Sequence, residues 1–211
     1  MKLREQLDEH FRAGTLVPTI VVGIHAGDRL REYGTAGQLD YKGRGDLALN
    51  HEHFVLEELI PFLEGRFNVR KTAAHRAIAG FSLGGLNAFD LAWRNPNEFG
   101  IAGVFSGALW WRHKAFRKKA PDADRIVHDY VRKAKKVPNV RCWFMAGTAD
   151  ETEDRNNNGI IDAIDDTLQL MALLSEKGQI EGKDFTYVEV EGGTHDPETW
   201  GKVVMDFLQW T

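Results

Sequence analysis

The sequence predicts an α/β fold: a mostly parallel sheet flanked by helices, in a single domain that spans residues 1–211. Short apolar runs alternate along the chain with longer helical patterns, which is typical of strands joined by covering helices. The chain also shows no repeat, low-complexity stretch or Pro/Gly/Ser-rich linker that would divide it. Its 211 residues, 43% of them hydrophobic, are enough for one sizeable core.

Five apolar runs are predicted to be strands, because each is short and is bounded by turn residues or by a helical pattern. Residues 27–46, which follow the first run, are rich in Gly and Asp and are expected to form a long loop. The predicted strands are Thr19–Ile24, Arg76–Gly80, Ile101–Phe105, Val140–Ala146 and Phe185–Val190.

Six segments are predicted to be helices. Asn50 is the expected N-cap of the second, Pro61 is expected to kink it, and Gly178 is expected to close the fifth at its C′ position. The predicted helices are the N-terminal segment with the apolar stripe Leu3, Leu7 and Phe11, followed by Asn50–Phe67, Leu83–Arg94, Asp122–Lys136, Asp165–Lys177 and Thr199–Trp210.

Composition argues against several classes of protein. The net charge is −4, and no basic stripe is strong enough to indicate binding to nucleic acid. No run approaches the roughly 18 apolar residues that a membrane helix needs. The N-terminus as written lacks a signal peptide, which indicates a cytoplasmic protein, whereas a longer N-terminus would allow secretion. Cys142, the only cysteine, lies in an apolar run and is expected to pack in the core.

Ser82 is the predicted nucleophile. It lies in Gly80-Phe81-Ser82-Leu83-Gly84-Gly85, which matches the G-x-S-x-G pattern and falls between a predicted strand and a predicted helix. A turn this tight brings its flanking positions against neighbouring backbone, where a Cβ would clash. The serine is then lifted above the sheet edge at a helix N-terminus, where the free N–H of Leu83 can stabilise an oxyanion.

His195 and Asp150 are the predicted general base and acid, because triads on such folds follow the chain order Ser, Asp or Glu, His. His195 comes after the fifth predicted strand, in a loop expected to be flexible enough to bring the imidazole to Ser82. Asp150 is the first carboxylate after the fourth predicted strand, and it would accept the other imidazole N–H. Glu151 and Glu153 remain alternatives for the acid.

Other candidates for the nucleophile and the base have less support. Ser106 follows a predicted strand but lacks a preceding glycine and a clear helix behind it, so we expect a pocket wall or a turn residue. His113 lies in a basic run, and His128 lies in a helical pattern where we expect it to face solvent. The histidines that precede Ser82 have no support from chain order, although His25 could line the pocket.

Together these segments resemble the esterase family of α/β-hydrolases that includes esterase D, ferric enterobactin esterase and feruloyl esterases. The resemblance implies that Ser82, Asp150 and His195 form a catalytic triad. It also places Trp110 and Trp111 near the acyl or alcohol pocket, although paired tryptophans equally suit a core. The matching segments are Pro18–Ile24, Glu32–Tyr33, Glu58–Phe62, Gly80–Gly85, Phe105–Trp111, Ala146–Asp150 and Gly192–His195.

The resemblance also exposes a difference at the N-terminus. Members of the family usually begin with further strands, one of which ends in an H-[DG]-G-type loop that supplies the second oxyanion N–H. This sequence opens at the helix that normally follows, so we expect an N-terminally truncated α/β-hydrolase. Either a second copy covers the open sheet edge, or Thr19–Ile24 moves beside Arg76–Gly80 and the loop at His25 offers the N–H. We favour the first outcome, which predicts a homodimer.

An acidic loop follows the predicted acid and indicates calcium. Seven carboxylates between Asp150 and Asp166 face one Arg155, which gives the loop a net charge of about −6. From Asp154 the loop fits D-x-[DN]-x-[DN]-G-x₅-E except that Asp replaces the final Glu. The alternative is an Asx-rich turn held by its own hydrogen bonds. The expected calcium ligands are Asp154, Asn156, Asn158, Ile160, Asp162 and Asp165.

The function predicted from these features is that of a serine esterase, which cleaves small or carbohydrate-linked carboxylic esters through an acyl-enzyme on Ser82. Its partner would be a small-molecule ester, with no membrane or nucleic acid involved. No organic cofactor is expected, and calcium would be structural. The alternative from another class is a non-catalytic, calcium-stabilised scaffold or binding protein derived from an esterase.

Overall fold

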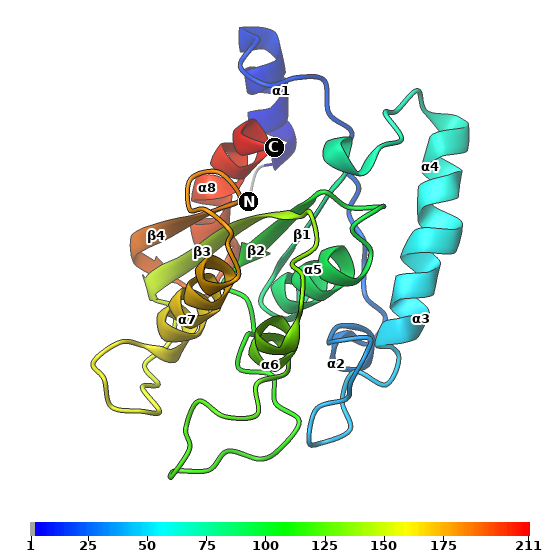
Figure 1. Ribbon diagram of the computed structural model, residues 1–211. Helices are drawn as coiled ribbons and strands as arrows, with labels where there is room; N and C mark the ends of the chain where they lie inside the picture. Colours follow the sequence, from blue (N-terminus) through cyan, green and yellow to red (C-terminus); the bar gives the residue numbers. More distant parts are fainter. Residues whose placement is uncertain (1–2) are drawn as a thin grey trace.

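The computed structural model describes residues 3–211 and contains one sheet of four strands (Figure 1). The strands are β1 (Ala77–Phe81), β2 (Ile101–Phe105), β3 (Arg141–Ala149) and β4 (Phe185–Thr194). They lie side by side in chain order, and each neighbouring pair is parallel. The prediction of a mostly parallel sheet flanked by helices is therefore confirmed.

Helices connect each pair of strands, as parallel pairing requires. In the described part of the chain, every helix is too short or too polar to cross a bilayer. The α-helices are α1 (Leu3–Ala13), α2 (Arg29–Glu32), α3 (Ala48–His53), α4 (Ile60–Arg66), α5 (Leu83–Arg94), α6 (Ile126–Lys133), α7 (Asp162–Glu176) and α8 (Pro197–Trp210). A π-helix, η1 (Phe54–Leu59), joins α3 to α4, and a 3₁₀ helix, η2 (Ala73–His75), precedes β1.

Alternate residues of the central strands face two different helical layers, because side chains on a strand alternate between its faces. In β2, Ala102 and Val104 belong to the cluster formed with α5, α6 and α7, whereas Ile101 and Phe105 belong to the cluster formed with α8. The apolar stripe of α1 packs on the outside of this second cluster. The sheet is thus the middle of three layers, and it is buried on both faces in β2.

The carboxyl ends of the strands converge on one edge of the sheet. The long segments that follow β2 and β3, residues 106–125 and 150–161, leave from this edge. In Figure 1 they lie on the same side of the molecule as residues 33–47, the blue loop after α2. Because open α/β sheets bind ligands at this edge, the three segments frame the candidate site.

The predicted strand Thr19–Ile24 is wrong. Residues 19–24 form no β-ladder, and Ile20, Val21 and Val22 are 49%, 44% and 40% exposed. The run has the β-branched composition of a strand, but a strand also needs a neighbour to accept its hydrogen bonds. Its last residue, Ile24, does pack against the core. β1 remains an edge strand, so the alternative in which this run moves beside β1 is not what the structure adopts.

The helix around Pro61 keeps its course but changes its hydrogen-bonding pattern. Proline lacks an N–H and crowds the carbonyl four residues before it, so a regular α-helix is disfavoured there. The chain responds with the π-helix of six residues directly before Ile60, after which α4 resumes with Pro61 in its first turn. The expected cap at Gly178 is confirmed, with φ at +91° just after α7.

Candidate active site

Ser82 lies at the sharp turn between β1 and α5. Its backbone has φ of 56° and ψ of −120°, a conformation that L-residues rarely adopt. A Cβ on Gly80 would overlap the backbone of Gly84, so the turn can be this tight only with glycine there. The strand–turn–helix placement predicted for the nucleophile is therefore present.

The predicted oxyanion donor Leu83 lies at the N-terminus of α5. Leu83 is the first residue of this helix, and its N–H has no acceptor within the helix. Tyr33 lies between this turn and the segment that carries His25. The ring of Tyr33 faces Gly84, and its hydroxyl lies 3.5 Å from the carbonyl oxygen of Ile24. His25 itself is exposed.

The predicted acid and base are brought together. Oδ1 of Asp150 lies 3.4 Å from Nδ1 of His195. The side chain of Asp150 is fully buried, whereas that of His195 is 42% exposed. The hydrogen bond that the imidazole donates to Asp150 raises the pKa of His195, and partial burial of the imidazole opposes this. Within residues 3–211 the Ser82 hydroxyl makes no hydrogen bond. Hydrogen bonds between a nucleophile and its base often form fully only when substrate binds.

The two strands that carry the acid and the base run further than predicted. β3 extends to Ala149 and β4 to Thr194, with a β-bulge between Gly147 and Ala149. Thr148 supports the bulge, since its hydroxyl accepts the N–H of Gly192 at 2.7 Å. His195 therefore follows the strand directly and does not lie on the flexible loop that we expected.

Trp200 on α8 is a site residue that the sequence analysis missed. Its indole stacks on Phe81 with ring centroids 4.8 Å apart, and it meets His195 edge to face at 5.3 Å. Its Nε1 donates a hydrogen bond of 3.0 Å to the hydroxyl of Ser106. Trp200 thus connects the residue before Ser82 with the candidate base. Its position five residues after His195, in the first turns of a helix, was the only available signal.

The competing candidates have other roles. Ser106 is buried, has φ of 46°, and its hydroxyl is held by Trp200 and Met145, which confirms it as a turn residue. His113 pairs with Asp129 on α6. The prediction that His128 faces solvent is wrong, because the ring is buried and bonded to the carbonyl of Asp166. Cys142 is buried as expected, and burial raises its pKa to about 12.

Glu151 and Glu153, the alternatives to Asp150, bind backbone N–H groups and not His195. Glu151 is half-buried, and its carboxylate accepts the N–H of Ala163 at the start of α7. Burial raises the pKa of Glu151 to about 7. Glu153 is exposed and accepts the N–H of Thr152. Asp150 is therefore the carboxylate that pairs with the imidazole.

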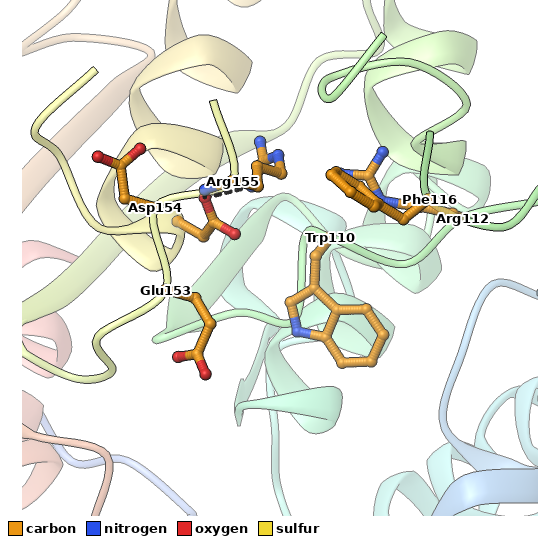
Figure 2. A pocket seen from close by; sticks show the side chains of 7 residues that line it. Trp110, Arg112, Phe116, Glu153, Asp154 and Arg155 are labelled. Carbon is orange, nitrogen blue, oxygen red and sulfur yellow. Dashed lines mark hydrogen bonds and ion pairs between the residues drawn. The ribbon is translucent and has the colours of Figure 1, made fainter. Parts of the chain in front are cut away.

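The two tryptophans after β2 lie in different environments. Trp111 is fully buried in the core, against Gly34 and Gly45. Trp110 is 38% exposed and lines a cavity of about 360 Å³. Figure 2 shows Trp110, Arg112 and Phe116 on one side of this cavity, with Glu153, Asp154 and Arg155 on the other. The cavity therefore combines exposed aromatic rings with carboxylate and guanidinium groups.

Comparison with known families decides the relationship. Residues 1–210 match a family model that is described as "Putative esterase". The chain belongs to this esterase family. Among known proteins, the uncharacterized protein YbbA of Bacillus subtilis (strain 168) is 24% identical over 210 residues, which cover 98% of this chain and 78% of YbbA. An endo-1,4-beta-xylanase/feruloyl esterase of Xylanibacter ruminicola is 28% identical over 104 residues, which cover 49% of this chain and 13% of that protein.

Solved esterase structures share the α/β-hydrolase fold of this family member. The enterobactin esterase of Shigella flexneri superposes with a TM-score of 0.71 at 20% identity, over 96% of this chain and 46% of that one. A ferulic acid esterase gives a TM-score of 0.69 at 19% identity, over 99% of this chain and 76% of that one. The chain thus spans less than half the length of the enterobactin esterase. The solved structures thus show the shared fold, and the family to which the chain belongs is one of esterases.

The acidic loop is folded by its own hydrogen bonds. The carboxylate of Asp154 accepts the N–H groups of Asn158 and Gly159, and the Asn156 side chain also accepts that of Asn158. The side chain of Asn158 accepts the N–H of Ile160. Gly159 has φ of +85°, which suits the glycine that the predicted loop places at its bend. These contacts are those of the Asx-rich turn that we considered as the alternative.

Arg155 meets the other predicted calcium ligands. Its guanidinium pairs with Asp162 at 3.0 Å and lies 4.0 Å from Asp165, and it also pairs with Asp166. Asp166 in turn pairs with the buried Arg125. Within residues 3–211, no three His, Cys, Asp or Glu side chains are grouped so as to hold a metal ion. Calcium would therefore have to draw two carboxylates away from Arg155.

Proposed function

We propose that the chain is a serine carboxylic-ester hydrolase that works through an acyl-enzyme on Ser82. The observation that carries the proposal is the pairing of Asp150 with His195 at the same sheet edge as the strained turn at Ser82. Asp150 would fix the tautomer of the imidazole and stabilise its protonated form. The stacking of Trp200 on Phe81 and its edge contact with His195 support the placement of the base beside the serine.

The proposed reaction has two halves. The Ser82 oxygen attacks the ester carbonyl carbon while His195 takes the hydroxyl proton, and the negative charge on the carbonyl oxygen is held by the Leu83 N–H. The intermediate then collapses, and the leaving alcohol takes the proton from His195. Water attacks the acyl group in the same way and releases the acid. We propose the segment at His25 for the second oxyanion donor, because Tyr33 holds it near Gly84.

The proposed substrates are small or carbohydrate-linked esters. The cavity beside Trp110 supports this class, because an exposed indole can pack against the apolar face of a sugar ring. The carboxylates of Glu153 and Asp154 can accept hydrogen bonds from the hydroxyl groups of the sugar. Trp110 is thus the proposed substrate contact, whereas the buried Trp111 supports it from the core.

Two further proposals concern stability and assembly. Structural calcium in the loop from Asp154 to Asp165 would add positive charge to a segment whose carboxylates outnumber its one arginine. A homodimer would cover the edge strand β1 and the exposed run at Val21. Both are tested by the predictions in the Discussion.

A fluorophosphonate probe tests the proposed mechanism directly. It should label wild-type protein at Ser82, and Ser82→Ala should abolish the label. Ser82→Ala and His195→Ala should each lower kcat on short p-nitrophenyl esters by about 10³-fold or more. Ser106→Ala is the matched control and should keep the label. A wild-type protein that is folded but unlabelled would instead favour the non-catalytic scaffold.

A further inference from the structure

A second pocket, separate from the cavity at Trp110, lies between α2 and the start of the α3–η1 helix. It encloses about 240 Å³ and is lined by Glu32, Leu47, Asn50, His51 and Phe54. None of these residues has a part in the proposed ester chemistry. The pocket combines a carboxylate, an amide and an imidazole with two apolar side chains.

The carboxylate in this pocket is fixed in place but has no cation partner. Its two oxygens accept the N–H groups of Gly27 and Asp28, each at 3.1 Å. Within residues 3–211, no Lys, Arg or His lies within ion-pair distance of Glu32. Arg31, on the same helix, pairs instead with Asp46. Glu32 therefore presents an uncompensated negative charge whose orientation is already set.

The imidazole at the base of the pocket adds no opposing charge. His51 is buried, meets Tyr33 edge to face at a centroid distance of 5.2 Å, and is hydrogen-bonded to Asn87 on α5. Burial lowers the pKa of His51 and outweighs the opposing effect of the Glu32 carboxylate, which favours the neutral ring. The net charge of the pocket lining is consequently negative.

An aromatic ring completes the pocket. Phe54 is 39% exposed and is the first residue of η1. The face of an aromatic ring attracts a cation. Leu47 supplies an apolar wall for the carbon part of a ligand.

We propose that this pocket binds the ammonium group of a small organic amine, with Glu32 as its counter-ion, Phe54 as a ring contact and Asn50 as a hydrogen-bond acceptor. The proposal does not depend on the esterase activity. It identifies a binding site one side chain away from the turn at Ser82, because Tyr33 lies between His51 and Gly84.

Isothermal titration calorimetry on the full chain at pH 7 tests this site with 2-phenylethylamine, which is charged at that pH. The neutral analogue 2-phenylethanol has the same shape and should bind at least about tenfold more weakly. Glu32→Gln should weaken amine binding at least about tenfold. Glu57→Gln removes a carboxylate of η1, the helix that carries Phe54. Glu57 does not line the pocket, so this variant should bind the amine as the wild type does.

Phe54→Leu provides a second variant, because Glu32→Gln also alters the turn at Gly27. This variant keeps an apolar side chain at the wall but removes the ring. It should weaken binding of the amine several-fold without lowering the melting temperature. Equal binding of the amine and the alcohol would overturn the proposal. So would amine binding that survives Glu32→Gln, or an amine that fails to bind the wild type at millimolar concentration.

Discussion

The backbones of Gly147 and Gly193 meet so closely that a Cβ on Gly147 would overlap the carbonyl group of Gly193. Gly147 lies at the bulge of β3, three residues before Asp150, and Gly193 lies two residues before His195. The close approach therefore lies between the strand ends that precede Asp150 and His195. A bulge interrupts the β3–β4 register next to this contact.

Gly147→Ala should disturb both stability and activity. We expect it to lower the free energy of unfolding by about 1–3 kcal/mol, since extra volume at a packed backbone contact forces the strands apart. It should also slow ester hydrolysis, because Asp150 and His195 move with the strands. Thermal unfolding and kcat/KM on a p-nitrophenyl ester measure the two effects.

The matched control is Gly65→Ala. A Cβ at that position of α4 meets nothing within 4 Å, and alanine favours a helix over glycine. Its melting temperature should therefore stay level or rise. If Gly147→Ala behaves in the same way as this control, the two backbones do not constrain the site.

Asp150→Asn should change the pH dependence of hydrolysis. The hydrogen bond that His195 donates to the Asp150 carboxylate is the main cause of the raised pKa of His195, and a general base must be neutral to act. Wild-type activity should thus fall as the pH drops through this raised value. Without the carboxylate the imidazolium is less stable, so the acidic limb of kcat/KM against pH should move to lower pH. The plateau should drop by about 10³- to 10⁴-fold.

Asp196→Asn is the control for this effect. Asp196 is next to His195 in sequence, but its carboxylate caps α8 by accepting the N–H groups of Glu198 and Thr199. The variant should lose some thermal stability and keep the acidic limb close to its wild-type position. An acidic limb that does not move in Asp150→Asn would show that Asp150 is not the partner of the base.

Two elements, β2 and α5, were predicted to the residue, whereas the predicted N-cap Asn50 lies inside α3, which begins at Ala48. β2 is a fully buried apolar run, and α5 begins after the serine turn and ends before Asn95-Pro96. The same reasoning failed for Thr19–Ile24, whose composition is equally strand-like. What decides between the two runs is whether a neighbouring strand is present, and a local pattern does not contain that information.

The candidate site shows the same division. Chain order and the serine motif were enough to select the Asp150–His195 pair that the structure joins. Trp200 was missed because an indole in an amphipathic helix looks like any core residue, and its contacts with Phe81 and Ser106 come from distant strands. The role of Arg155 was also hidden, because a sequence motif for calcium treats that position as variable.

Calcium should raise the melting temperature, and a chelator should lower it, if the loop binds the ion in its native state. Asp154→Ala should remove this response. Asp184→Ala, which removes a carboxylate outside the loop, should retain it. Because Arg155 already pairs with two of the predicted ligands, the response should grow in Arg155→Gln, where Asp162 and Asp165 are released. A wild-type melting temperature that changes with neither calcium nor chelator would contradict the proposal.

The last prediction concerns assembly. β1 is an edge strand with Ala77 and Ala79 exposed, and an unprotected edge tends to pair with another chain. The exposed apolar run at Val21 should strengthen such contacts. Light scattering at micromolar concentration should therefore give twice the 23.9 kDa mass of one chain.

Val21→Lys places a charge in the exposed apolar run and should shift the equilibrium toward the monomer. Ile180→Lys, an exposed position next to the opposite edge strand, should leave the dimer intact. A wild-type protein that remains monomeric at every concentration tested would refute the dimer. The edge of β1 would then not be covered by a second copy.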